Sequence, residues 1–366
     1  MSTVVFYISG HGLGHASRQA EIIRALRRER PNVEIVVKTS APRWFFEQAR
    51  LDRLVIDPIE PDTGVTQIDS LRVNVVQSID RCDSFHRTLD HRAKREATDL
   101  QTRGAKLVVG DIPPLACAAG ARAGLPTIAI SNFTWDWIFD SYPETTERAP
   151  ALVDTLAEAY AGATAAWRLP LHSGFEAFDK VVDVPIVARR STKAPDELRD
   201  VLRLPRDRRL ALFSFGRYGI GDIDWSCVQK LRDYQVVFST RGHTDGSPRG
   251  ATFTTLDEAR LATIGITYAD VMAAVDVVIT KPGFGMIAEC AANDTAMLYT
   301  DRGRFPEYDV LVAGMPAMIR AAHISHDDLF SGCWQDHLDQ LLSSPRPARI
   351  DLSGATILGR KIAELI

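Results

Sequence analysis

The sequence predicts an α/β protein built from two doubly wound, Rossmann-like domains that face a central cleft. Short apolar runs alternate with helical patterns along most of the chain, which is typical of parallel sheets covered by helices. The alternation stops near residues 189–195 and then starts again. The chain also has 366 residues, whereas single hydrophobic cores stop growing at about 250–300 residues. We therefore expect two domains of similar size.

The first domain is expected over residues 1–188. Its predicted strands are short apolar runs at 4–8, 33–37, 54–56, 107–109 and 126–130. Its predicted helices lie at 19–29, 84–101 and 115–123. The first of these helices stops before Pro31, which cannot continue a helix, and the last ends at Gly124, which readily terminates one.

The polar segment 189–195 is predicted to be a linker because it lacks apolar periodicity. The second domain is then expected over residues 196–366, with a final helix that packs back on the first domain. Its predicted strands lie at 210–215, 235–239, 275–279 and 295–299, in that order, with no strand after the last. Its predicted helices lie at 225–231, 268–274 and 355–365. Ligands bind at the carboxyl ends of strands in such sheets, so two facing edges would form a cleft for two substrates.

Composition narrows the class of protein and its partners. The net charge of −4 gives no electrostatic reason to expect nucleic acid as a partner. The five cysteines form no Cys-x-x-Cys pair, which favours a reducing cytoplasm over a disulfide framework or a structural zinc site. We expect a cytoplasmic protein, since no signal-peptide pattern and no apolar run of about 20 residues is present. A peripheral membrane contact and the oligomeric state are left open.

A glycine-rich run at residues 9–18 joins the first predicted strand to the first predicted helix. Its glycines allow close backbone approach to a ligand, and the helix N-terminus favours anionic groups. The spacing matches neither the dinucleotide fingerprint nor a P-loop. His15 is the preferred general base for a hydroxyl group, with His11 as the competing candidate. The structural alternative is that His15 only caps backbone groups and that Arg18 is solvated.

Asp111 stands at the end of a predicted strand, at the same sheet edge as the glycine-rich run. A carboxylate there would orient the histidine and stabilise its cation. Asp is also a favoured helix N-cap, and a helix follows, so both roles are open.

The second domain carries two further glycine loops. Residues 280–289 follow a predicted strand and open a helix, where Gly283 and Gly285 allow close approach and the helix N-terminus favours a diphosphate. Lys281 would add a point charge, and Glu289 would accept hydrogen bonds from a ribose diol or merely complement the helix dipole. The loop at 215–221, with Gly216 and Arg217, is a weaker signal of the same kind.

A third segment, at residues 302–308, follows the last predicted strand at the same edge. Arg304 would contact phosphate and Glu307 would hold sugar hydroxyls, although isolated charges of this kind are often only surface residues.

These motifs together resemble the GT-B glycosyltransferases, particularly family 28, which includes the lipid-II-forming N-acetylglucosaminyltransferase. The loop 10–15 resembles that enzyme's first glycine loop, and 269–289 resembles the donor signature whose glutamate, here Glu289, binds the nucleotide ribose. The chain is more similar still to the N-terminal, glycosyltransferase-like half of the plant L-arabinokinases, over 9–18, 62–67, 109–118, 131–137 and 183–190. The resemblance is confined to the glycosyltransferase-like half of those proteins, so it does not imply kinase activity. The terminal donor motifs of plant secondary-product transferases are absent, so the donor sugar is not implied.

The resemblance implies an inverting, metal-independent transfer of a hexosyl or N-acetylhexosaminyl group from a nucleotide-diphosphate sugar, with UDP the expected nucleotide and no other cofactor. His15 would be the base and Asp111 its orienting group. The expected donor-binding residues are Gly216, Arg217, Lys281, Gly283, Gly285, Glu289, Arg304 and Glu307. The expected acceptor site comprises the loop 61–69 with Gly12, Gly14, Arg18, Phe133, Trp135 and Trp137. Aromatic faces suit sugar rings, but each of these aromatic residues has a core role as its alternative.

Two other functions stay open on the sequence. Gly12–Arg18 also fits the Gly-x-Gly-His-x-x-Arg loop of the sugar-nucleotide hydrolases of pseudaminic acid synthesis, which makes water an alternative acceptor. The other alternative is a non-catalytic protein that binds sugar nucleotides.

Overall fold

The computed structural model describes residues 2–49, 51, 53–216, 219–221, 223–240 and 248–366. The chain divides into two compact units. Unit 1 contains residues 1–66, 73–188 and 351–366, and unit 2 contains residues 67–72 and 189–350. The segment expected to be a linker, 189–195, therefore belongs to unit 2.

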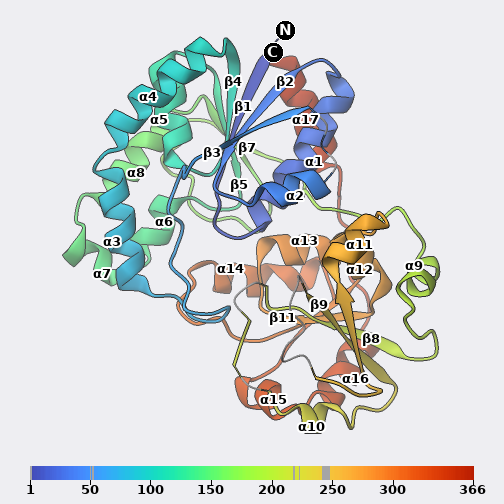
Figure 1. Cartoon of the computed structure of the whole chain (residues 1–366). Helices are drawn as coiled ribbons and strands as arrows, with labels where there is room; N and C mark the ends of the chain where they lie inside the picture. Colours follow the sequence, from blue (N-terminus) through green and yellow to red (C-terminus); the bar gives the residue numbers. More distant parts are fainter. Residues whose placement is uncertain (1, 50, 52, 217–218, 222, 241–247) are drawn as a thin grey trace. The chain divides into compact units, whose positions relative to one another are not determined.

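Unit 1 is built on a seven-stranded parallel sheet with the order β3-β2-β1-β4-β5-β6-β7 (Figure 1). Its strands are β1 (Thr3–Ile8), β2 (Glu34–Thr39), β3 (Leu54–Pro58), β4 (Ala105–Asp111), β5 (Thr127–Ser131), β6 (Ala165–Arg168) and β7 (Val181–Asp183). Successive side chains of a strand point to opposite faces, so β1 contributes to two cores. Val4 and Phe6 share a core with Ile22 and Leu358 on one face, and Val5 shares a core with Leu100 and Ala116 on the other.

The helices of unit 1 cover both faces of this sheet (Figure 1). They are α1 (Gly14–Glu29), α2 (Arg43–Gln48), α3 (Val75–His86), α4 (Leu89–Thr102), α5 (Pro114–Ala123), α6 (Trp135–Asp140), α7 (Pro143–Arg148), α8 (Leu152–Ala161) and α17 (Gly354–Glu364). The single helix predicted at 84–101 is wrong, because α3 ends at His86 and a separate helix, α4, begins at Leu89. Helix α1 begins at Gly14, earlier than predicted, which places His15 in its first turn.

The last helix, α17, packs against α1 within unit 1 (Figure 1). The two helices approach closely at Gly359, where a Cβ atom would lie 2.7 Å from the backbone of Ala25. Leu358 and Ile362 on the same helix are fully buried in the core beside β1. Residues 351–366 thus complete the hydrophobic core of unit 1.

Unit 2 repeats the same topology in a six-stranded parallel sheet with the order β10-β9-β8-β11-β12-β13. Its strands are β8 (Arg209–Phe213), β9 (Tyr234–Thr240), β10 (Phe253–Asp257), β11 (Val277–Thr280), β12 (Ala296–Tyr299) and β13 (Ala321–His323). Strand β12 was expected to be the last, and this is wrong because β13 pairs with it. Strand β13 has only three residues, Ala-Ala-His, without the apolar run that marks the others.

The helices of unit 2 include one 3-10 turn. They are α9 (Pro195–Leu202), α10 (Trp225–Val228), α11 (Glu258–Thr263), α12 (Tyr268–Ala274), α13 (Phe284–Asn293), α14 (Glu307–Gly314), η1 (Met315–Ala317), α15 (His326–Ser331) and α16 (Gln335–Ser343). Trp334 is fully buried in the core of the unit, where its ring stacks on Phe213 at 5.7 Å. Among the described residues, no helix is long and apolar enough to cross a membrane.

Both sheets reverse their strand order at one point, between β1 and β4 in unit 1 and between β8 and β11 in unit 2. Ligands of doubly wound sheets bind at the carboxyl ends of the strands that flank such a switch point. The segments that follow these four strands begin at Ser9, Ile112, Ser214 and Lys281. The topology therefore selects one candidate site in each unit.

Candidate active site

The switch point of unit 1 brings His15 and Asp111 together. His15 lies in the first turn of α1, and Asp111 is the last residue of β4, which pairs with the end of β1. The His15 Nδ1 atom lies 2.7 Å from Asp111 Oδ1, and the carboxylate is fully buried. The carboxylate is the strongest acceptor near this ring, so Nδ1 carries the proton and donates it to Asp111. The Nε2 atom then keeps the lone pair that a general base needs.

Asp111 is held by more groups than the sequence indicated. Arg18 donates from Nε to Oδ2 and from Nη2 to Oδ1, both at 2.6 Å, and Gln19 donates to Oδ2 at 2.8 Å. Burial by itself would raise the pKa of Asp111, but the charges of Arg18 and His15 and their hydrogen bonds lower it to about 2. The carboxylate therefore stays ionised and can orient and stabilise an imidazolium.

Arg18 was expected in the acceptor site, but its donors are engaged inside unit 1. Besides Asp111, it donates to Asn132 Oδ1 at 2.6 Å and to Ser131 Oγ at 3.3 Å, at the end of β5. Its Nη2 atom also lies 2.9 Å from His15 Nδ1. Arg18 thus supports the His15–Asp111 pair, while contact with an acceptor stays a prediction.

A second buried carboxylate, Asp62, lies in the loop after β3. It accepts hydrogen bonds from Ser9 Oγ and from the Trp135 indole, both at 2.9 Å. Burial raises the pKa of Asp62 to about 6, and the charge of His15 and these hydrogen bonds oppose that rise. Because the charge of His15 lowers the pKa of Asp62, the two groups interact electrostatically. Asp62 holds Trp135 and the first glycine loop in place.

The aromatic residues expected at the acceptor site form a row within unit 1. The rings of His15 and Phe133 lie 5.7 Å apart, those of Phe133 and Trp135 lie 5.0 Å apart, and those of Trp135 and His11 lie 5.8 Å apart, all edge to face. Phe133 and Trp135 are buried, whereas Trp137 on α6 is half-buried. The row connects both candidate histidines. Whether it binds an acceptor stays a prediction.

The glycines of the first loop differ in what surrounds them. A Cβ atom at Gly10 would lie 1.9 Å from Ser40 Oγ, so packing requires glycine there. At Gly12 and Gly14 a Cβ atom would meet nothing within 4 Å, and Gly12 has a positive φ of 75°. His11 lies beneath the neighbouring loop, since a Cβ at Gly64 would be 2.6 Å from its ring. The open space is therefore at Gly12 and Gly14, next to His15.

The switch point of unit 2 places Lys281 and Gly283 between the end of β11 and the start of α13. Gly283 is the N-cap of α13, no side chain caps this end, and the first turn has no acidic residue. A Cβ atom at Gly283 would meet nothing within 4 Å, and Gly285 is the second residue of the helix. Burial and the charge of Arg302 lower the pKa of Lys281 to about 7. This arrangement suits an anion.

Two predicted donor residues are held by arginines that the sequence did not identify. Glu289, on α13, is buried, and its Oε1 atom accepts from Arg189 Nε at 2.7 Å and also from Arg189 Nη2. Glu307, at the start of α14, accepts from Arg302 Nη1 at 3.1 Å. Arg304 is exposed in the loop before α14. Both predicted donor carboxylates are therefore paired with arginines in the structure.

The loop after β8 is only partly described. Gly216 has a positive φ of 70°, with nothing within 4 Å of a Cβ atom. Arg217, expected to bind the donor, lies outside the described residues. Residues 222–224 read Asp-Ile-Asp, a spacing found at some metal sites, and Asp222 also lies outside the described residues. Asp224 caps α10 by accepting from the backbone N–H groups of residues 226 and 227.

Known proteins resemble this chain in sequence and in fold. No family model matches the chain. The L-arabinokinase of Arabidopsis thaliana is 28% identical over 347 residues, which cover 92% of this chain and 32% of that protein. The chain therefore spans about a third of the length of this curated relative.

Solved structures match over nearly the whole chain. The glycotransferase of kitacinnamycin has a TM-score of 0.65 and 16% identity, over 99% of this chain and 97% of that one. This chain has the GT-B fold. The glycosyltransferase VinC in complex with dTDP matches with a TM-score of 0.58 and 14% identity, over 99% and 94% of the two chains. A UDP-glucosyltransferase from Polygonum tinctorium matches with a TM-score of 0.59 and 12% identity, over 100% and 98%.

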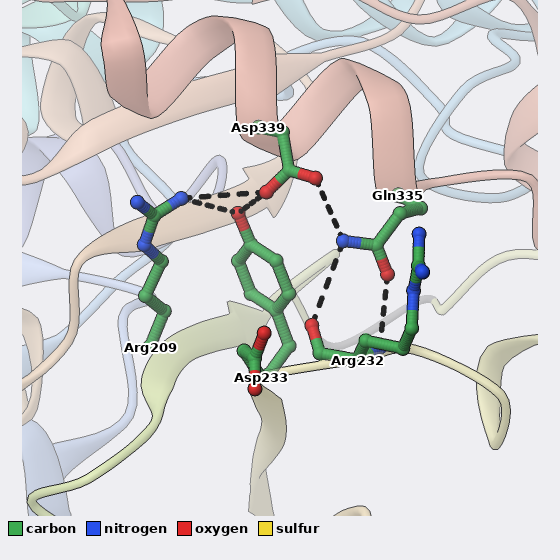
Figure 2. Close-up of a pocket in the computed structure, with 6 residues that line it drawn as sticks. Arg209, Arg232, Asp233, Gln335 and Asp339 are labelled. Atoms are coloured by element: carbon green, nitrogen blue, oxygen red, sulfur yellow. Dashed lines mark hydrogen bonds and ion pairs between the residues drawn. The ribbon is translucent and has the colours of Figure 1, made fainter.

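In this GT-B chain, a polar hollow lies at the opposite edge of the second sheet, where β8 and β9 begin (Figure 2). Tyr234 donates to Asp339 at 2.8 Å, and Arg209 donates to the Tyr234 oxygen at 3.1 Å. Gln335 donates to Asp339 at 2.8 Å and accepts from the backbone N–H of Arg232 at 2.9 Å. These groups satisfy one another, and the hollow is far along the strands from the switch point. It is best explained as structural.

Several residues of the two candidate sites were missed by sequence reasoning as individual functional residues. They are Ser9, Gln19, Asp62, Asn132, Arg189 and Arg302. Asn132 could have been found from its position just after a predicted strand. Asp62 lies in the loop 61–69, which the sequence analysis assigned to the acceptor site only as a whole. Arg189 gave no such signal, because it lies in a polar segment that resembles a linker.

Proposed function

We propose that the chain is a glycosyltransferase that moves a sugar from a nucleotide-diphosphate sugar, a UDP-sugar, to a hydroxyl acceptor. The observation that carries the proposal is the hydrogen bond of His15 Nδ1 to the buried Asp111 at the switch point of unit 1. It is supported by an anion-binding arrangement at the switch point of unit 2. The similar GT-B structures are described as glycosyltransferases, one with dTDP and one acting with UDP-glucose.

In the proposed reaction, His15 Nε2 removes the proton of the acceptor hydroxyl. The oxygen attacks the anomeric carbon from the face opposite the diphosphate, so a new C–O bond forms as the old one breaks and the configuration inverts. The electron pair of the broken bond stays on the β-phosphate oxygen. Asp111 stabilises the imidazolium, and Arg18 and Gln19 keep the carboxylate in position.

The donor would lie at the second switch point. Its diphosphate would contact the N-terminus of α13, Gly216, Gly283 and Lys281. The positive end of the helix and the charge of Lys281 would stabilise the leaving group without a resident metal. Glu289 would accept hydrogen bonds from the ribose. Arg304 and Glu307 would lie next to the phosphate and the sugar, with Glu307 held by Arg302. A hexosyl or N-acetylhexosaminyl group is the proposed sugar.

The test uses purified protein with a panel of UDP- and dTDP-sugars and hydroxyl acceptors, followed by product analysis. We expect His15→Ala to lower turnover by about 10²–10⁴-fold, the usual contribution of a general base, while UDP affinity is unchanged. His91→Ala is the matched control, because His91 is exposed on α4. Turnover of His15→Ala equal to that of the unaltered protein would exclude His15 as the base.

Two further arms separate the alternatives. Incubation without acceptor should leave the sugar nucleotide intact, and rapid release of free sugar would instead show that water is the acceptor. EDTA should leave the rate unchanged, and a loss restored by a divalent cation would contradict metal independence. Binding of sugar nucleotide without turnover under any condition would indicate a binding protein.

A further inference from the structure

The polar segment that begins at Arg189 is attached to the helices of unit 2. Asn293, the last residue of α13, donates from Nδ2 to the backbone carbonyl of Arg189 at 3.0 Å and accepts from the backbone N–H of Ser191 at 2.9 Å. Ser191 Oγ donates to Asp270 on α12 at 2.6 Å. The backbone that carries the Arg189 side chain is therefore held by two helices.

The Arg189 side chain binds Glu289, which the sequence predicts to bind a ribose. Arg189 donates from Nε to Glu289 Oε1 at 2.7 Å and from Nη2 to the same oxygen. Glu289 is buried, and a carboxylate removed from water needs a partner. Because the guanidinium group is planar and rigid, two donors from it on one oxygen also fix the direction of the carboxylate.

The contacts of Arg189 lead to the switch point of unit 2. Its guanidinium carbon lies 5.7 Å from the centre of the Tyr268 ring, and the Tyr268 hydroxyl lies 2.8 Å from Ser214 Oγ. Ser214 is the first residue after β8, which flanks the switch point. Burial raises the pKa of Tyr268, and the charge of Glu289 adds to that rise. The Arg189–Glu289 pair is therefore connected, through Tyr268, to the strand end where a ligand is expected.

A carboxylate held in this way keeps the capacity to bind a ligand. An ionised carboxylate only accepts hydrogen bonds, and its two oxygens offer about four lone-pair positions. Arg189 directs two donors to Oε1 of Glu289, and the diol of a ribose would present two more. Hydrogen bonds to a charged acceptor are short and strong, so their contribution depends on the direction in which the carboxylate is held.

We propose that Arg189 is a positioning residue that makes the donor site selective for ribonucleotides over 2′-deoxyribonucleotides. The inference rests on the proposed function of Glu289 as the group that binds the ribose. Arg189 acts through Glu289: it directs the carboxylate toward the ribose diol, including the 2′-hydroxyl. A deoxyribose would leave part of a buried carboxylate without its donor, and this lowers the affinity of the deoxynucleotide.

The experiment is calorimetric titration of the full chain with UDP and with 2′-deoxy-UDP. The unaltered protein should bind UDP about tenfold or more tightly than 2′-deoxy-UDP, as expected for one hydrogen bond to a charged group. Arg189→Ala should weaken UDP binding by about tenfold and leave the affinity for 2′-deoxy-UDP nearly unchanged, so that the two affinities become similar. Arg190→Ala is the matched control, because Arg190 is the exposed neighbour in the same segment.

Two further variants separate positioning from a general loss of stability. Arg189→Lys keeps the positive charge without the rigid fork and should retain a preference for UDP of about threefold. It also carries the test if Arg189→Ala does not fold. Glu289→Ala should lose the preference, and adding Arg189→Ala to it should change the ratio of affinities no further, because the two residues act as one unit.

The outcomes are distinct. Equal affinities for UDP and 2′-deoxy-UDP in the unaltered protein, or an unchanged ratio in the Arg189 variants, overturn the inference and leave the proposed function standing. Tighter UDP binding by Arg189→Ala also overturns it, because the pair would then obstruct the ribose. If neither nucleotide binds the unaltered protein, both the inference and the proposed function fail.

Discussion

At the scale of single residues, the candidate site depends on charges buried in unit 1. The Asp111 carboxylate has four donors within 2.8 Å, contributed by His15, Arg18 and Gln19. Each donor offsets part of the desolvation cost of the carboxylate. The carboxylate is therefore both the positioning group of the histidine and the anchor of Arg18.

Replacing Asp111 with Asn should destabilise unit 1, because it leaves the Arg18 guanidinium buried without its counter-ion. We expect a loss of about 3 kcal/mol, in the range measured when one partner of a buried pair is removed. Urea unfolding at pH 7 measures it. Asp200→Asn, which breaks an exposed pair with Arg206, should change little.

The same variant gives a pH signature. The pKa of Asp111 is lowered to about 2, below the usual value of about 3.9, so its contribution to stability is present above pH 4 and is lost as pH falls toward 2. The difference in stability between Asp111→Asn and the unaltered protein should therefore shrink below pH 4. A constant difference from pH 7 to pH 3 would contradict this role.

At the scale of elements, the two glycine-rich turns differ in what their glycines do. At Gly10, packing against Ser40 requires glycine, whereas at Gly283 there is space for a side chain and an extended backbone that any residue adopts. Glycine at position 283 is therefore explained by a ligand better than by folding.

Gly283→Val should separate binding from stability. The fold should tolerate the side chain, with a change in unfolding free energy within about 0.5 kcal/mol, as for surface substitutions. The added methyl groups should block the approach of a diphosphate, so UDP affinity should fall by about tenfold or more, as measured by calorimetry. Gly10→Val should instead unfold unit 1, and unchanged UDP affinity in Gly283→Val would contradict a donor site at α13.

At the scale of the whole molecule, the chain returns to unit 1 at its last described segment. Helix α17 contributes Leu358 and Ile362 to the core beside β1, and its Gly359 allows the close approach to α1. Unit 1 therefore depends on residues that are more than 300 positions apart in the sequence.

Gly359→Leu should destabilise unit 1, since the added side chain cannot fit against the backbone at Ala25. Overpacking of this kind costs about 1–3 kcal/mol. Hydrogen exchange should show faster exchange in unit 1, with that of unit 2 unchanged. Thr356→Leu, an exposed position on the same helix, is the control, and equal effects of both variants would contradict the close packing.

The sequence by itself predicted the α/β class, and it predicted a candidate site at each sheet edge, because both predictions depend on local signals. Apolar runs such as those of β1 and β11 predict buried parallel strands, and glycine, histidine and lysine just after them mark carboxyl edges. Helix limits were predicted less well where only two residues, Arg87 and Thr88, separate consecutive helices. The short strand β13 was missed because it has no apolar run.

Tertiary structure alone decided which polar and charged groups are paired. Arg18 and Asp111 are separated by 93 residues, Arg189 and Glu289 by 100, and Ser9 and Asp62 by 53. Hydrogen bonds and ion pairs depend on distance in space, and local spacing carries no information about partners so far apart. The same reason applies to Lys281: the sequence identified its positive charge, whereas only the tertiary structure showed that the charge of Arg302 helps to lower its pKa.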